Sequence, residues 1–67
     1  MKLWWAYLHK YGNIQVKEWV AGNTFLNEAR TSPNVKRFLE KPFEAATYDE
    51  AQGVAKKLLA DLVSIEN

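Results

Sequence analysis

The sequence has 67 residues, of which 48% are hydrophobic, 13% aromatic and 25% charged, and it contains no cysteine and one histidine. This length predicts a single domain over residues 1–67, and the lack of cysteine excludes a disulfide framework and a thiolate metal site. One histidine forms a zinc site only if several carboxylates converge on it, so we expect no metal and no cofactor. We therefore expect a small soluble domain of a reducing compartment, the cytoplasm, that is held together by packing alone.

The net charge is +1, far from the strongly basic character that is typical of nucleic-acid-binding domains. This average conceals an asymmetry, because residues 1–41 carry seven basic and three acidic side chains, whereas residues 42–67 carry two basic and five acidic ones. The split indicates a weakly basic sheet and a weakly acidic C-terminal helix. The apolar run from Leu3 to Leu8 is too short for a signal-peptide core or a membrane span, so we expect no membrane association.

Residues 3–9 and 14–20 are rich in aromatic and aliphatic side chains and flank Tyr11-Gly12-Asn13, a sequence typical of a β-hairpin turn. A three-residue loop, with Gly12 or Asn13 at positive φ, would place Lys10 opposite Ile14 and separate the side chains into two faces. The aliphatic face would contain the pairs Leu8 with Val16, Ala6 with Glu18, and Trp4 with Val20. The other face would contain the pairs His9 with Gln15, Tyr7 with Lys17, and Trp5 with Trp19.

The segment after the hairpin predicts a short helix and then a third strand. Asn23 or Thr24 can cap a helix through about Arg30, with Phe25, Leu26 and Ala29 facing inward. Residues 35–45 are compatible with a second short helix that ends before Pro42, because Ser32-Pro33 resembles a helix start. A third strand is favoured, since it would complete a sheet with one buried face, and Pro42 would place it at an edge or a bulge.

The C-terminal third predicts a long amphipathic helix. Thr47 and Glu50 have the spacing of a capping box, in which the Thr47 hydroxyl accepts the Glu50 N–H and the Glu50 carboxylate reaches back to the start of the helix. An apolar stripe at helical spacing follows, formed by Ala51, Val54, Ala55, Leu58, Leu59, Leu62 and Val63. Gly53 lies on the polar side and costs about 1 kcal/mol relative to alanine. The element order is β-β-α-β-α: an α+β fold with a three-stranded antiparallel sheet and the long helix on one face.

Side chains that could perform catalysis are sparse. No pair of carboxylates is placed to have opposed pKa values, and the sequence contains neither a glycine-rich phosphate loop nor a Ser/His/Asp arrangement. His9 is interpreted as an exposed histidine at a strand end rather than a base or a ligand, because it lacks partners. We therefore expect a non-enzymatic protein without a small-molecule substrate.

The face opposite the aliphatic one is the candidate binding face. It comprises Trp5, Tyr7, His9, Gln15, Lys17 and Trp19, joined by Arg37 from the third strand. Three explanations compete for these aromatic residues. The tryptophans could form a cross-strand pair or be covered by residues 21–34 through Phe25 and Leu26. The face could bind a protein, either a partner or a second copy. It could also bind nucleic acid, with bases stacked on the aromatic rings and Lys10, Lys17, Lys36 and Arg37 on phosphates.

Two resemblances bear on these alternatives. The strand order together with residues 43–51 (FEAATYDEA) is similar to the DNA-binding domains of plant AP2 factors and of the amino-terminal arms of phage integrases, which implies DNA binding by the sheet. This chain departs from that pattern, because it inserts residues 21–34 between strands and its sheet is not strongly basic. The hairpin of residues 4–17, with the strand at 42–45 and the helix, also resembles small uncharacterised phage and prophage proteins. That resemblance implies an accessory protein that acts by binding.

Overall fold

The computed structural model describes residues 1–66 and the side chains of residues 1–61. Within this range the elements follow in the order β1 (Lys2–His9), β2 (Ile14–Glu18), α1 (Phe25–Thr31), β3 (Val35–Phe38), β4 (Phe43–Ala45) and α2 (Tyr48–Glu66). The predicted α+β class, antiparallel sheet and long C-terminal helix are confirmed. The helix alternative for residues 35–39 is wrong, because Val35–Phe38 forms a strand.

The third strand is split in two. β1 lies in the centre of the sheet, with β2 on one side and both β3 and β4 on the other, all antiparallel to it. Tyr7 pairs with Phe38 of β3, and Trp4 pairs with Phe43 of β4. The chain therefore advances five residues along the edge while β1 advances only three. The two extra residues bulge out of the ladder before Pro42, which cannot donate a backbone hydrogen bond.

The hairpin register differs by two residues from the prediction. Leu8, and not Lys10, lies opposite Ile14, and Tyr7 and Trp5 pair with Gln15 and Lys17. The three-residue loop begins one residue earlier than expected: the His9 N–H donates to the Asn13 carbonyl at 2.8 Å, and Gly12, at φ +98°, ends the loop. Glycine in this left-handed conformation is the usual third residue of such loops. Because the shift is even, the side chains of the paired residues 4–8 and 14–18 keep their predicted faces.

The end of β2 differs accordingly. The strand ends at Glu18, and Val20, predicted to be opposite Trp4, is exposed. Glu18 takes the place opposite Trp4 and lies 3.9 Å from the Lys2 ammonium, with both side chains more than half exposed. Glu18, the charged residue among the pairs predicted for the aliphatic face, therefore lies on an edge strand, partly in solvent.

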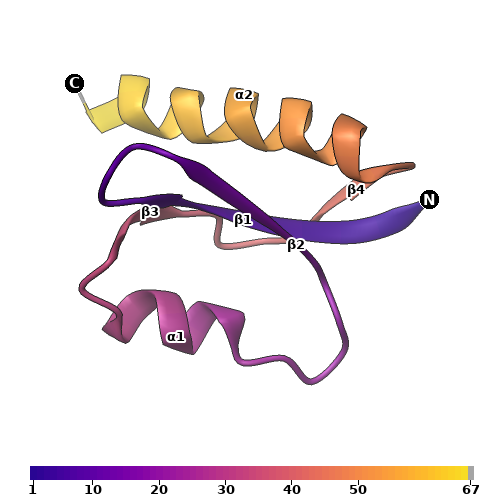
Figure 1. The fold of residues 1–67 in the computed structure, drawn as a ribbon, viewed down its shortest axis with the longest axis horizontal. Coiled ribbons are helices and arrows are strands. Elements are labelled where there is room, and N and C mark those ends of the chain that lie inside the picture. Colours follow the sequence, from indigo (N-terminus) through magenta and orange to yellow (C-terminus); the bar gives the residue numbers. More distant parts are fainter. Residues whose placement is uncertain (67) are drawn as a thin grey trace.

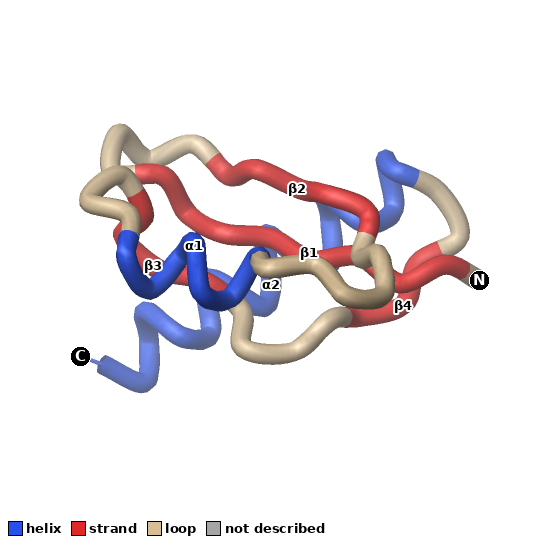
Figure 2. Tube along the Cα trace, turned by 90° about the horizontal axis from the view of Figure 1, so that it is seen from below, coloured by secondary structure: helices blue, strands red, loops and turns tan. Residues whose placement is uncertain are grey.

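Helices cover both faces of the sheet, as Figure 1 shows. α2 packs on the aliphatic face through Ala51, Ala55 and Leu59, which are buried as predicted, against Trp4 and Ala6 of β1. Leu62 and Val63 lie outside the residues whose side chains are described. α1 lies on the opposite face, in front of β1 in the view of Figure 2. The sheet is therefore the middle of three layers, and neither of its faces is open along its whole length.

Side-chain oxygens accept hydrogen bonds from backbone N–H groups at the start of both helices. The Glu50 N–H donates to Thr47 Oγ1 at 3.2 Å, as the predicted capping box requires. The Glu50 carboxylate reaches back as well, but its Oε2 accepts the Ala46 N–H at 3.4 Å, one residue before the Thr47 N–H of a standard capping box. Of the two candidates for α1, Thr24 occupies the N-cap position without a side-chain cap hydrogen bond, and Asn23, one residue earlier, accepts the Phe25 N–H on its Oδ1 at 2.9 Å. These caps satisfy N–H groups that the first turn of a helix leaves without partners.

Two adjacent tryptophans connect the central strand to the two parts of the split edge. Trp4 and Trp5 point to opposite faces because successive side chains alternate along a strand. The Trp4 indole donates to the Ala45 carbonyl at 3.0 Å, and the Trp5 indole donates to the Leu39 carbonyl, both in buried positions. Leu39 lies just beyond the end of β3, so the Trp5 indole satisfies a carbonyl outside the ladder, whereas the Trp4 indole adds a hydrogen bond to Ala45, which already pairs with Lys2.

Candidate functional site

The predicted aromatic binding face is largely covered by α1. Trp5 is only 2% exposed, and its ring stacks on Phe25 with centroids 5.3 Å apart. Trp19 contacts the same Phe25 ring edge-on at 6.0 Å and is partly buried. Of the three explanations for the aromatic residues, the structure shows the cover by residues 21–34. Trp5 is therefore not accessible to a partner.

A small cleft remains between α1 and the sheet. It has a volume of about 210 Å³, and Trp5, Tyr7, Lys17, Phe25 and Glu28 are among its lining residues. The Lys17 ammonium lies 5.1 Å from the Phe25 ring centroid and 5.8 Å from that of Tyr7, which are distances typical of cation–π contacts. A cation of the protein itself therefore already lies over the aromatic rings of this cleft.

The remaining predicted residues lie apart from this cleft. Gln15 is exposed on β2 opposite Tyr7. His9 is partly buried at the end of β1, where its Nδ1 accepts the Tyr11 N–H at 3.3 Å. Arg37 lies opposite Leu8, on the face covered by α2, and so it was wrongly grouped with Trp5. The structure brings together Trp5, Tyr7, Lys17 and Trp19, but not Arg37.

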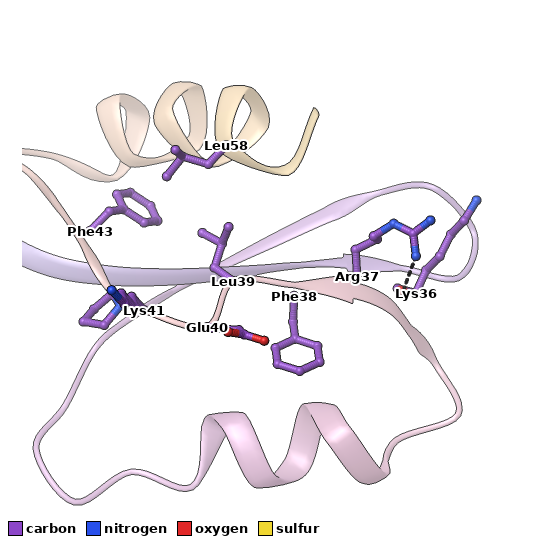
Figure 3. Close-up of a pocket in the computed structure, with 9 residues that line it drawn as sticks. Lys36, Arg37, Phe38, Leu39, Glu40, Lys41, Phe43 and Leu58 are labelled. Carbon is purple, nitrogen blue, oxygen red and sulfur yellow. Dashed lines mark hydrogen bonds between the residues drawn. The ribbon is translucent and has the colours of Figure 1, made fainter. Parts of the chain in front are cut away.

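A larger groove lies along the split edge, between β3, β4 and α2 (Figure 3). It has a volume of about 540 Å³. Its apolar part includes Leu39, Phe43 and Leu58, and Figure 3 shows Leu39 and Phe43 pointing toward α2 while Phe38 points toward α1. The bulge at residues 39–42 makes this groove, because there the chain leaves the regular ladder.

The charges around the groove are mainly basic. Lys36, Arg37 and Lys41 line it together with a single acidic residue, Glu40. Lys36, Lys41 and Glu40 are exposed, whereas Arg37 is partly buried and donates from its guanidinium to the Lys36 carbonyl at 3.4 Å. The groove therefore combines an apolar floor with a positively charged rim.

The backbone of β3 adds hydrogen-bonding groups to this site. The Leu39 N–H donates inward, to the Ala6 carbonyl at 3.1 Å. Backbone groups of successive residues alternate in direction along an antiparallel strand, so the N–H and C=O of Phe38 point away from β1. β3 is an edge strand, and these groups face the open side of the sheet.

Sequence reasoning missed this groove. Two sequence features could have indicated it. Basic residues are interspersed with aromatic ones between Lys36 and Phe43, and Pro42 interrupts the predicted third strand. The prediction, however, was one continuous third strand, in which these side chains would alternate between the two faces of the sheet and no groove would form at its edge. The groove depends on the bulge, whose size is set by the registers of β3 and β4 and not by a sequence motif.

Among residues 1–61, no group of His, Asp and Glu side chains is placed to hold a metal ion. Neither helix, over the part the structure describes, is long and apolar enough to cross a membrane. The groove can offer apolar contact, positive charge and backbone hydrogen bonds to a bound group.

Comparison with known proteins adds no assignment: no protein-family model, no curated protein and no solved structure matches this chain.

Proposed function

We propose that this protein is a non-enzymatic interaction module that binds a segment of a protein partner in the groove along its split edge strand. One observation carries the proposal: an apolar depression with a basic rim adjoins an edge strand in which the N–H and C=O of Phe38 face outward. Peptide-binding domains commonly use this combination, in which backbone hydrogen bonds supply affinity and side-chain pockets supply specificity.

The proposal moves the binding surface from the aromatic face to the edge of the sheet. Trp5 cannot contact a partner beneath α1, whereas Phe43 and Leu58 are only partly buried and line the groove. A protein partner is favoured over a second copy, because symmetric pairing of two β3 strands would bring Lys36 and Arg37 close to the same basic residues of the other copy.

Nucleic-acid binding is the weaker candidate. It relied on bases stacking on the aromatic face, and α1 covers Trp5. Its cations Lys36 and Arg37 line the groove instead. The phage or prophage accessory role and the cytoplasmic location stay predictions from the sequence.

Selection from a library of random peptides tests the proposed function. We expect the immobilised protein to enrich peptides that lose about tenfold in affinity on Leu58→Gln, because this change places an amide in the apolar floor. The matched control is Lys57→Gln, which lies one residue away on the exposed side of α2 and should leave binding unchanged. Circular dichroism verifies that both variants fold. A selection without enrichment, or peptides that bind native protein and Leu58→Gln equally, would refute the proposal.

A further inference from the structure

On the basis of this proposed function, we infer that the occupant of the groove is an extended acidic peptide segment that pairs with β3 as an additional strand. It inserts an apolar side chain toward Leu39, Phe43 and Leu58, while its carboxylates lie near Lys36 and Lys41. Three properties of the described residues lead to this partner: the direction of the β3 backbone groups, the position of the apolar floor on the α2 side of the sheet, and the positive charge of the rim.

The backbone sets the conformation of the occupant. The inward hydrogen bond of the Leu39 N–H leaves the Phe38 N–H and C=O directed to the open side. An extended chain satisfies such groups without bending, whereas a helix has already used its own N–H and C=O groups internally. Pro42 has no N–H, so the pairing is confined to β3 and does not continue along β4.

The floor of the groove sets the pattern of side chains. Side chains of an added strand alternate between the two faces of the sheet, so every second one would point to the α2 side. On that side Leu39, Phe43 and Leu58 offer apolar surface, and Figure 3 shows Leu39 and Phe43 directed into this space beneath α2. An apolar residue flanked by residues that remain in solvent therefore fits the groove.

The rim sets the charge. Three basic residues, Lys36, Arg37 and Lys41, line the groove with one acidic residue, Glu40, in a chain whose net charge is only +1. Lysines and prolines on an edge strand are a known protection against pairing with another copy of the same protein. The positive charges of the rim would repel the equally basic β3 of a second copy and attract a negatively charged strand. The edge therefore favours an acidic peptide over pairing with itself.

A short synthetic peptide in which Glu alternates with Val and Leu is the probe. We expect a nuclear magnetic resonance titration to shift the Phe38 and Lys36 amide signals, and the Phe38 amide to become protected from hydrogen exchange. A peptide with Lys in place of Glu should not bind. An acidic peptide with N-methyl groups on alternate amides should lose binding, because it keeps its charge but cannot pair as a strand.

Charge reversal identifies the contribution of the rim. Lys36→Glu combined with Lys41→Glu should weaken binding of the acidic probe about tenfold at low salt. The matched control is Lys56→Glu combined with Lys57→Glu, an equal change in charge on the exposed side of α2, and it should alter binding less than twofold. Equal losses in the two double variants would show that only net charge matters, and would overturn the inference.

The remaining outcomes separate the inference from the proposed function. If selected peptides bind the groove but are not acidic, or if the N-methylated peptide binds as well as its parent, the inference is wrong and the proposed function stands. If no peptide binds, both are wrong. If a single-stranded oligonucleotide binds the same residues more tightly than the acidic peptide, the partner is nucleic acid and the inference is overturned.

Discussion

Replacement of Trp5 by phenylalanine should be among the most destabilising conservative changes in this protein. Phenylalanine keeps a ring against Phe25 but removes the indole donor to the Leu39 carbonyl, which is buried at the bulge. A buried carbonyl without its donor costs about 1–3 kcal/mol. The smaller ring leaves unfilled space beside a side chain that is 2% exposed, and this adds about 1 kcal/mol. We therefore expect the free energy of unfolding to fall by about 2–4 kcal/mol.

This loss is large for so small a chain. A domain of 67 residues is expected to have a free energy of unfolding of roughly 3–10 kcal/mol, so the midpoint of thermal unfolding should fall by on the order of 15 °C. Urea unfolding followed by far-ultraviolet circular dichroism measures the change without depending on tryptophan fluorescence. Trp19→Phe is the matched control, because Trp19 is partly exposed, and it should cost less than about 1 kcal/mol.

The location of the effect tests the reasoning further. Hydrogen exchange should accelerate at the Leu39 amide in Trp5→Phe more than at amides in the middle of α2. Trp4→Phe should instead loosen β4, because the Trp4 indole donates to Ala45. A cost for Trp5→Phe no greater than that for Trp19→Phe would refute the idea that the indole holds the split edge to the central strand.

Four further substitutions have expected outcomes that urea unfolding can check. Gly53→Ala should raise the free energy of unfolding by about 0.5–1 kcal/mol, because the glycine is exposed in α2 and its added methyl group meets no atom; a decrease would contradict this. Gly12→Ala should lower it by about 1–2 kcal/mol, since φ is +98°. Thr47→Ala should lower it by about 1 kcal/mol through loss of the cap, and no change would show that the capping box contributes nothing. Lys2→Ala should change it by less than about 0.5 kcal/mol, because the contact with Glu18 is exposed; a larger loss would mean that the pair matters.

The features that follow from local periodicity were predictable from the sequence. The two faces of the hairpin follow from alternation, and they remain correct even though the register is shifted, because an even shift preserves the faces. The buried positions Ala51, Ala55 and Leu59 follow from helical spacing. The hydrogen bonds from the Phe25 N–H to Asn23 and from the Glu50 N–H to Thr47 follow from side-chain chemistry that acts within four residues.

The features that depend on distant parts of the chain were not fixed by these patterns. Whether Trp5 is covered depends on where a seven-residue helix packs, and the apolar residues of α1 are compatible with either face of the sheet. The split of the third strand depends on two separate registers against β1. Pro42 predicted an irregularity, but only the structure shows that two extra residues are accommodated there and that a groove results.

The tryptophans and the groove are connected through the same bulge. In a sheet covered by helices on both faces, the only long run of backbone that can meet a partner is at an edge, and a regular exposed edge promotes pairing between copies. Here the bulge shortens the pairing surface of β3 and opens an apolar depression beside it, while the Trp5 indole satisfies the Leu39 carbonyl that the bulge displaces. Loss of that hydrogen bond should therefore weaken peptide binding as well as stability, because the position of Leu39 shapes the floor of the groove.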